Sequence, residues 1–233
     1  MIPVVLVHGG SFAGSCWDRL VPYLDGSTLA VDLPGRGRHP APPASVTIEA
    51  ASRSVVGDID EAGFDEVILV GHSLAGSSLP ATVGLLGRRV RHVVLVACTV
   101  PSHGQSALDT LPSEVQEMVR VARDAEPGVL DDELARAFFG NDLDAEQFAW
   151  CKAQMVPEGL TLVMGQVDHT PLRVPVPRTW VRPLRDAIVD PEKQLEFARN
   201  VGDCPVIDID AGHMCMISQP RRLAEILNGI ADQ

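Results

Sequence analysis

The sequence predicts a doubly wound α/β fold built on a mostly parallel sheet. Short runs of Val, Ile and Leu recur along the chain, and they are continuous rather than alternating, as is typical of strands buried on both faces of a parallel sheet. Segments of helical character lie between these runs, and that alternation favours a doubly wound arrangement. The expected strands are residues 2–7, 29–31, 67–70, 93–96, 179–181 and 206–209, and the expected helices are residues 17–24, 47–61, 74–86, 191–200 and 220–231.

One long interval interrupts the alternation, between the strand that runs from Val93 to Val96 and the next strand at Thr179. Its first part repeats apolar residues at helical spacing, and its last part, 171–177, is too rich in proline for a helix or a strand. We therefore expect a mostly helical cap, residues 101–173, inserted into a single core formed by residues 1–100 and 174–233.

Composition restricts the partners of the chain. Of its 233 residues 45% are hydrophobic, enough to bury one sizeable core. The net charge is −12, and no run of basic residues could neutralise phosphates or an anionic bilayer. The first apolar run, 2–7, is too short to span a membrane and is not followed by a signal cleavage site. We expect a cytoplasmic protein that binds neither nucleic acid nor membrane.

The five cysteines are odd in number and include no C-x-x-C pair. This pattern suits a reducing compartment and predicts neither a disulfide framework nor a zinc site. We expect each cysteine to pack as a small buried apolar side chain.

Ser73 lies between a strand-like run and a helix-like run, within residues 67–76, which read VILVGHSLAG. A serine in this position is typical of a nucleophile elbow, where a strained backbone points the hydroxyl into the site. Such a turn needs small residues two positions before and after the serine. Gly71 and Ala75 meet this requirement, although the usual pattern has glycine at the second position. A serine that only caps a helix is the alternative.

His8, Gly9 and Gly10 directly follow the first expected strand. Glycines at this point let backbone amides face the same centre as the serine, so the amides of Gly10 and Leu74 are the expected oxyanion hole. A tight turn without a catalytic role is the alternative for the tripeptide.

A serine hydroxyl needs an adjacent base to become an effective nucleophile. Of the seven histidines, only His213 follows a terminal strand, in a loop that leads to the last helix, and a solvent-exposed loop histidine is the alternative. The chain order of serine, acid and histidine agrees with a catalytic role. For the acid, Asp186 at the end of the loop after strand 179–182 is the candidate. Asp190 is its rival, and Asp168 fits a surface ion pair better.

These motifs resemble the α/β-hydrolase superfamily and, more narrowly, the plant-type methylesterase and hydroxynitrile lyase family with its bacterial relatives. The resemblance covers most of the chain outside the expected cap. It rests on residues 8–10 (HGG) followed by Trp17, on residues 32–37 (DLPGRG), on residues 71–76 (GHSLAG) and on residues 211–216 (AGHMCM). In that family an aromatic residue precedes the catalytic aspartate by six positions and a glutamine follows it by eight. Trp180, Asp186 and Gln194 reproduce this spacing, which favours Asp186 over Asp190.

The lyases of that family carry a threonine after the first-strand histidine and a lysine after the catalytic histidine. This chain has Gly9 and Met214 at those positions, which favours the esterase branch. The resemblance therefore implies an esterase or lactonase that forms an acyl-enzyme on Ser73 from a small carboxylic ester or lactone. A lyase or cyclase of natural-product metabolism that uses His213 as a base, and a ligand-binding protein of the same fold, are the alternatives.

The expected cap supplies four candidate substrate contacts, with core packing as their alternative role: Phe138, Phe139, Trp150 and Met155. A small-molecule substrate is the expected partner. No metal or organic cofactor is implied, and a homodimer is left open.

Overall fold

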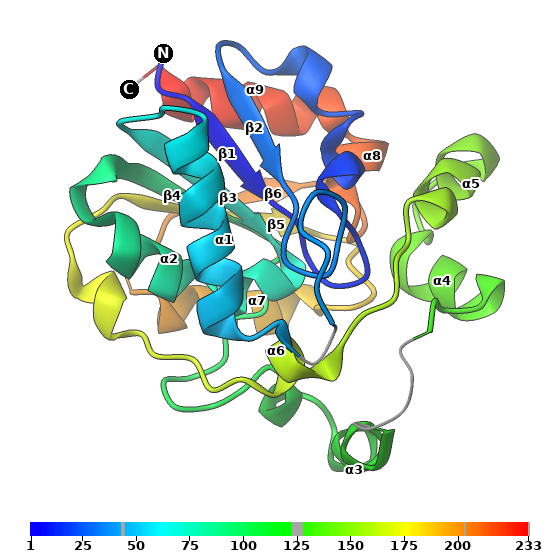
Figure 1. The fold of residues 1–233 in the computed structure, drawn as a ribbon. Helices are drawn as coiled ribbons and strands as arrows, with labels where there is room; N and C mark the ends of the chain where they lie inside the picture. The colour runs from blue at the N-terminus through cyan, green and yellow to red at the C-terminus, as the bar shows by residue number, and fades with distance from the viewer. Residues whose placement is uncertain (43–44, 123–127, 203, 233) are drawn as a thin grey trace.

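The computed structural model describes residues 1–42, 45–122, 128–202 and 204–232 (Figure 1). Within these residues, six parallel strands form one sheet in the order β2-β1-β3-β4-β5-β6. The predicted doubly wound α/β fold is confirmed. The strands are β1 (Val4–Val7), β2 (Thr28–Val31), β3 (Val67–His72), β4 (Val90–Val96), β5 (Arg178–Pro183) and β6 (Val206–Ile209).

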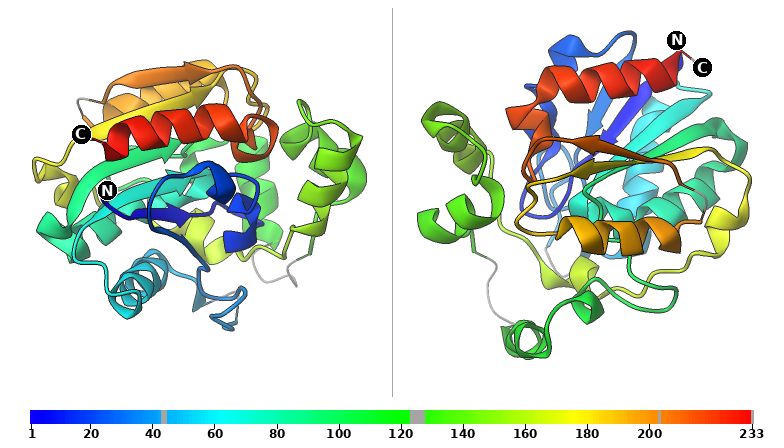
Figure 2. Two further views of the ribbon diagram at one scale, coloured as in Figure 1. Left: turned by 90° about the horizontal axis from the view of Figure 1, so that it is seen from above. Right: turned by 180° about the vertical axis from the view of Figure 1, so that it is seen from behind.

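Helices cover both faces of this sheet (Figures 1 and 2). Successive side chains of a strand point to opposite faces. In β1, Val4 and Leu6 therefore join the core under α9 (Pro220–Ala231), whereas Val5 and Val7 join the core under α1 (Ile48–Glu61), α2 (Leu79–Leu86) and α7 (Pro191–Asn200). Burial on both faces is the reason that the strand sequences are continuously apolar.

Two expected helices differ from the prediction. Residues 17–24 do not form an α-helix, and two short 3-10 turns, η1 (Gly14–Trp17) and η2 (Val21–Tyr23), occupy this region. The reason is Pro22, which has no N–H to donate and whose ring obstructs a preceding α-helical turn. The expected helix 74–86 is divided into the 3-10 turn η4 (Ser73–Ser77) and α2, where Pro80 lies in the first turn, a position that favours proline.

The interval between β4 and β5 is mostly helical. It contains η6 (Leu108–Thr110), α3 (Ser113–Ala122), α4 (Asp132–Phe139), α5 (Ala145–Ala153), α6 (Leu160–Met164) and η7 (Thr170–Arg173). Residues 123–127 of the expected cap lie outside the described residues. Helices α4 and α5 form a hairpin at one side of the molecule, where α5 contacts the short helix α8 (Cys215–Ser218) (Figure 2). The division into a core and a cap stays a prediction.

Most of the cysteines pack as buried side chains. Four cysteines are buried and Cys204 is half-buried. None of the described helices is both long and apolar enough to cross a membrane.

Candidate active site

Ser73 directly follows the buried strand β3 and has a left-handed backbone conformation, with a φ of 53°. This conformation is uncommon for a residue with a side chain and stores strain. The Ser73 carbonyl accepts a hydrogen bond from the Thr99 amide at 2.9 Å, which helps to hold the turn. The structure therefore contains the strained strand-to-helix turn that the sequence predicts at this serine.

Close packing around the turn requires two glycines. A Cβ on Gly71 would lie 2.6 Å from Cδ1 of Leu79, and a Cβ on Gly9 would lie 2.7 Å from Cβ of Ser73. Both distances are far shorter than a normal carbon–carbon contact. Ala75 is fully buried, so its methyl group is accommodated at the second small position. Gly9 thus gives the serine the room that a larger residue would occupy.

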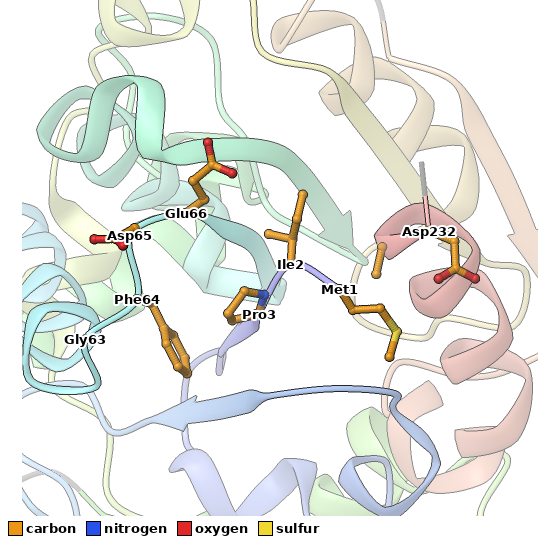
Figure 3. A pocket seen from close by; sticks show the side chains of 9 residues that line it. Met1, Ile2, Pro3, Gly63, Phe64, Asp65, Glu66 and Asp232 are labelled. Atoms are coloured by element: carbon orange, nitrogen blue, oxygen red, sulfur yellow. The ribbon is translucent and has the colours of Figure 1, made fainter.

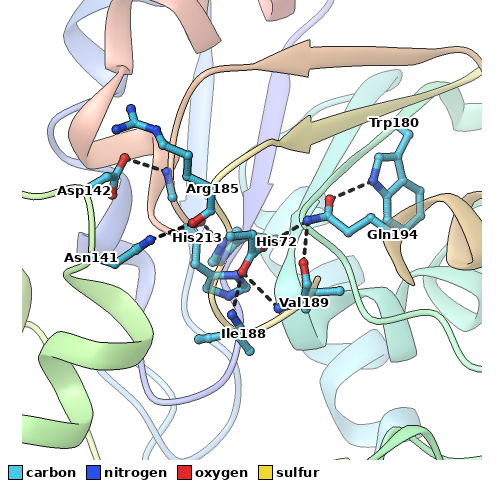
Figure 4. A network of polar contacts seen from close by, with 11 residues as sticks. His72, Asn141, Asp142, Trp180, Arg185, Ile188, Val189, Gln194 and His213 are labelled. Carbon is cyan, nitrogen blue, oxygen red and sulfur yellow. Dashed lines mark hydrogen bonds and ion pairs between the residues drawn. The ribbon is translucent and has the colours of Figure 1, made fainter. Parts of the chain in front are cut away.

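His213 and Asp186 form a buried pair. His213 Nδ1 lies 2.8 Å from Asp186 Oδ2, and neither side chain is exposed. Asp186 Oδ1 accepts hydrogen bonds from the amides of Ile188 and Val189 at 2.8 and 2.9 Å (Figure 4). Burial alone would raise the pKa of Asp186, but the interactions with His213 and these amides outweigh it and hold that pKa below its usual value. A charged carboxylate in this position favours a proton on Nδ1 of His213.

The glutamine predicted by the resemblance completes this network. Gln194 Nε2 donates to Asp186 Oδ2 at 3.1 Å and to the Val189 carbonyl at 2.8 Å. Gln194 is itself oriented by Trp180, whose Nε1 donates to Gln194 Oε1 at 3.2 Å (Figure 4). The rival acid, Asp190, instead caps α7 by accepting the Glu192 amide at 2.8 Å. The structure therefore places Asp186, and not Asp190, against His213.

The other ring nitrogen of His213, Nε2, is buried and has no hydrogen-bond partner among the described residues. His213 lies beside the Ser73 turn, because its backbone carbonyl accepts a hydrogen bond from His72 Nε2 at 3.0 Å and the two rings are 4.6 Å apart. An unpartnered Nε2 beside the turn that carries Ser73 could act as a general base, and such contacts often tighten only when substrate binds.

His72 is not itself suited to proton transfer. Burial and the neighbouring His213 lower the pKa of His72 to about 3, so its ring is neutral at physiological pH. As the last residue of β3, it packs against the His213 loop.

His8 holds the loop after β1. Its Nδ1 donates to the Gly9 carbonyl at 2.7 Å and its Nε2 accepts the Leu33 amide at 3.1 Å, so the ring is neutral. Burial, together with the nearby Arg36 charge, lowers the pKa of His8 to about 3. The loop that carries Gly10 is thereby tied to the strand end beside it.

The two residues predicted to form the oxyanion hole are neighbours. A Cβ on Gly10 would lie 3.3 Å from Cδ2 of Leu74. Leu74 is the first residue after Ser73 and lies in the first turn of η4, where backbone N–H groups have no acceptor earlier in the helix. The formation of an oxyanion hole by the amides of these two residues stays a prediction.

An ion pair that the sequence does not predict lies beside this loop. Arg36 donates to Oε2 of Glu158, and the same oxygen accepts the Ser11 amide at 2.8 Å. The side chains of Arg36 and Glu158 are only 3% and 14% exposed. Ser11 has a φ of 63°, so this contact supports a second strained residue, next to Gly10. Arg36 belongs to the DLPGRG segment, but Glu158 lies in no motif, and no local signal connects the two.

A cavity of about 630 Å³ opens beside Ser73. Its wall is mostly apolar, with Asp190 and Lys193 as its charged members. The lining residues are Ser73, Leu74, Thr99, Ala107, Thr110, Leu111, Pro112, Val163, Ile188, Val189, Asp190, Lys193 and Phe197. A pocket of this size and character is typical of a small-molecule site.

The four predicted substrate contacts do not line this cavity. Phe139 is buried with its ring centroid 5.8 Å from that of His213, and Met155 is buried in the core under α9. Trp150 is half-buried beneath the Arg19 guanidinium, 5.1 Å from its ring centroid, and Phe138 is 39% exposed. Contact of these four residues with substrate stays a prediction.

A larger hollow, of about 790 Å³, lies at the opposite end of the strands, where β1 and β3 begin (Figure 3). It is lined by Met1, Ile2, Pro3, Gly63, Phe64, Asp65, Glu66, Ala231 and Asp232. Ligands of open α/β sheets bind at the carboxyl ends of the strands, so the cavity at Ser73 is the better candidate despite its smaller volume. Nowhere in the described part of the chain do three or more His, Cys, Asp or Glu side chains form a group that could hold a metal ion.

Comparison with known proteins gives consistent results. Residues 4–226 match the model of the alpha/beta hydrolase family. The chain is similar to a carbendazim hydrolyzing esterase of Nocardioides sp., with 28% identity over 97% of this chain and 98% of the relative. It is also similar to a putative chloroplastic methylesterase 14 of Arabidopsis thaliana, with 26% identity over 97% of this chain and 71% of the relative.

Among solved structures, an extracellular alpha/beta-hydrolase from a Paenibacillus species superposes with a TM-score of 0.87. It is 23% identical, and the match covers 97% of this chain and 98% of that one. The family match spans nearly the whole sheet and includes Ser73, Asp186 and His213. The chain is therefore an enzyme of the alpha/beta hydrolase family.

Proposed function

We propose that the enzyme is a serine hydrolase that cleaves a small carboxylic ester or lactone through an acyl-enzyme on Ser73. The observation that carries this proposal is the buried hydrogen bond between His213 Nδ1 and Asp186 Oδ2. It leaves Nε2 of His213 as a proton acceptor, next to a serine held in a left-handed conformation. This is the division of roles in a catalytic triad.

In the acylation step, Ser73 Oγ attacks the carbonyl carbon of the ester while His213 Nε2 takes the serine proton. The amides of Gly10 and Leu74 donate hydrogen bonds to the developing oxyanion. The carbon–oxygen bond to the alcohol then breaks, and His213 returns the proton to the departing alkoxide. Asp186 remains ionised and stabilises the transient imidazolium.

In the deacylation step, a water molecule attacks the acyl carbon and His213 takes a proton from it. The bond to Ser73 Oγ breaks, the serine regains a proton from His213, and the carboxylic acid leaves. With a lactone, the alcohol and the acid are parts of one product. No step uses a metal or an organic cofactor.

The substrate class follows from the cavity and from the relatives. The mostly apolar cavity beside Ser73 suits an uncharged ester of modest size. Two relatives carry the names esterase and methylesterase, which supports an ester as the bond that is cleaved. Residues 101–173 act in this proposal as a cap, because Ala107, Thr110, Leu111, Pro112 and Val163 form one wall of the cavity.

The proposal is tested by incubating the enzyme with a fluorophosphonate and mapping the adduct by mass spectrometry. A serine activated by histidine beside an oxyanion hole reacts with the tetrahedral phosphorus, so Ser73 should carry the label and Ser73→Ala should abolish it. Protein that stays unmodified under conditions that label a known serine hydrolase contradicts the proposal. Cyanide release from aromatic cyanohydrins, without turnover of any ester or lactone, would show a lyase instead.

A further inference from the structure

The turn between α4 and α5 contacts both loops that carry the acid–histidine pair. Asn141 Nδ2 donates a hydrogen bond to the Arg185 carbonyl at 2.7 Å. Asp142 Oδ2 accepts the Gly212 amide at 2.6 Å (Figure 4). Arg185 directly precedes the acid and Gly212 directly precedes the histidine. We call Asn141 and Asp142 the latch.

The latch fits closely against a glycine. A Cβ on Gly212 would lie 2.5 Å from both Asn141 Oδ1 and Asp142 Oδ1. The φ of Gly212 is not positive, so an alanine would suit the backbone and only the contact with the latch excludes it. The glycine in the loop before His213 is thus explained by side chains from the α4–α5 turn.

The surface that the latch contacts is a single unit. The Arg185 amide donates to the Ala211 carbonyl at 2.9 Å, and the Arg185 side chain pairs with Asp210 at 2.8 Å. These bonds join the loop after β5 to the loop after β6. The latch therefore restrains both loops at their junction.

The latch is also fixed on its own side. Leu143 and Phe139, which flank the turn, are buried in the core under α9. Asp144 begins α5 with a capping box, in which its side chain accepts the Gln147 amide at 2.8 Å and its amide donates to Gln147 Oε1 at 3.0 Å. Buried side chains and the start of α5 therefore anchor the turn that carries the latch.

We propose that Asn141 and Asp142 are positioning residues, which hold the Asp186–His213 pair at its distance from Ser73 without touching the substrate. The inference rests on the proposed hydrolase function. Loops are the more mobile parts of a fold, and a displacement of about 1 Å in a catalytic group can lower the rate roughly 100-fold. The α4–α5 hairpin would in this way control the rate of the chemical step.

The test compares three variants of the full-length enzyme with the parent, using an activated aryl ester. Asp142→Ala removes the acceptor for the Gly212 amide, and we expect kcat to fall about 30- to 100-fold while KM changes less than about 3-fold. Asp142→Asn keeps a side-chain oxygen for that amide, so it should recover kcat to within about 3-fold of the parent. Asp131→Ala is the matched control, because it removes the side chain that caps α4 at the end away from the latch, where Asp131 accepts the Leu134 amide at 2.9 Å, and its kcat should stay within about 2-fold of the parent.

Hydrogen exchange, measured by mass spectrometry on the same proteins, provides a reading that does not depend on turnover. Exchange of the segment 209–214 should rise in Asp142→Ala and not in Asp131→Ala. Equal losses of kcat in the two alanine variants, or an unchanged kcat and exchange in Asp142→Ala, would contradict the positioning role of the latch. A parent enzyme that neither turns over esters nor reacts with fluorophosphonate would contradict the proposed function instead. In that case the hydrogen-exchange comparison alone would show whether Asp142 restrains the segment 209–214.

Discussion

The Nδ1 atom of His213 lies 2.8 Å from Oδ2 of Asp186, and the carboxylate is held by the amides of Ile188 and Val189 and by Gln194. These hydrogen bonds occupy both carboxylate oxygens of Asp186 and hold the carboxylate in its orientation toward His213. The imidazole is consequently held in one tautomer and one orientation, with Nε2 available for proton transfer.

Replacing Asp186 with Asn should lower kcat by about three to four orders of magnitude, because the amide no longer favours the proton on Nδ1 of His213. Asp190→Asn is the control: Asp190 caps α7, so the change should cost about 1 kcal/mol of stability at most and leave kcat within a few-fold. Steady-state kinetics with an aryl ester, on variants shown to be folded by circular dichroism, measure both. A larger loss of kcat in Asp190→Asn than in Asp186→Asn would identify Asp190 as the catalytic acid instead.

Gly9→Ala should slow catalysis, because the added Cβ would meet Cβ of Ser73 at 2.7 Å and push the nucleophile from its position. We expect kcat to fall about 10- to 100-fold. Gly57→Ala is the matched control, since it lies in α1 with no atom within 4 Å of the added Cβ. It should keep full activity and raise the free energy of unfolding by about 0.5–1 kcal/mol. An unchanged kcat in Gly9→Ala would show that the added Cβ does not displace Ser73.

Removing Arg36 should destabilise the fold, because Glu158 would be left as an almost buried charge. For Arg36→Met we expect a loss of about 3–5 kcal/mol in the free energy of unfolding, measured with urea. The double variant Arg36→Met with Glu158→Met should recover most of it, apart from about 1–2 kcal/mol for the unpaired Ser11 amide.

The exposed pair of Arg53 and Glu49 provides the comparison, since these side chains are 68% and 74% exposed. Arg53→Met should change stability by less than about 1 kcal/mol. Similar losses for Arg36→Met and Arg53→Met would contradict a structural role for the buried pair.

Acid should destabilise the protein through two buried histidines. The pKa values of His8 and His72 are about 3 in the folded chain, against about 6.5 when unfolded. Below about pH 6.5 the unfolded chain therefore binds protons that the folded chain does not, and stability falls as the pH is lowered towards 3, by about 1.4 kcal/mol per pH unit for each histidine.

Urea unfolding between about pH 7 and about pH 4.5 measures this slope. His72→Gln keeps an amide nitrogen that can donate in place of Nε2. It should lower the slope of stability against pH by the contribution of one histidine, about 1.4 kcal/mol per pH unit. Equal slopes in the parent and in His72→Gln would rule out this source of acid sensitivity.

The parts of the site that the sequence predicted are those fixed by their neighbours in the chain. Ser73 follows a strand and precedes a helix, and His213 follows the last strand, so the parallel sheet alone brings both to one edge. The spacing of Trp180, Asp186 and Gln194 favours Asp186 over Asp190, and the structure joins these three residues by hydrogen bonds. The predicted helix at 17–24 is wrong because Pro22 lies within it.

The parts that escaped prediction depend on contacts between distant segments. Glu158 meets Arg36 across 122 positions, and Asp142 meets Gly212 across 70. A polar residue outside a motif gives no sign of such a partner, because its role depends on how the helices between β4 and β5 fold over the sheet. The same reason explains why the chosen aromatic residues are not in the cavity wall, while Thr110 and Leu111 are.

The most direct test of the account is to trap the acyl-enzyme. The enzyme is mixed with an activated aryl ester, quenched in acid during turnover, digested, and analysed by mass spectrometry, with Ser73→Ala treated in parallel. The account predicts one acyl group on the peptide that contains Ser73, formed in a burst of phenol release and absent from the variant. Turnover of the ester at full rate with Ser73 unmodified at every quench time, and retained in Ser73→Ala, would contradict it.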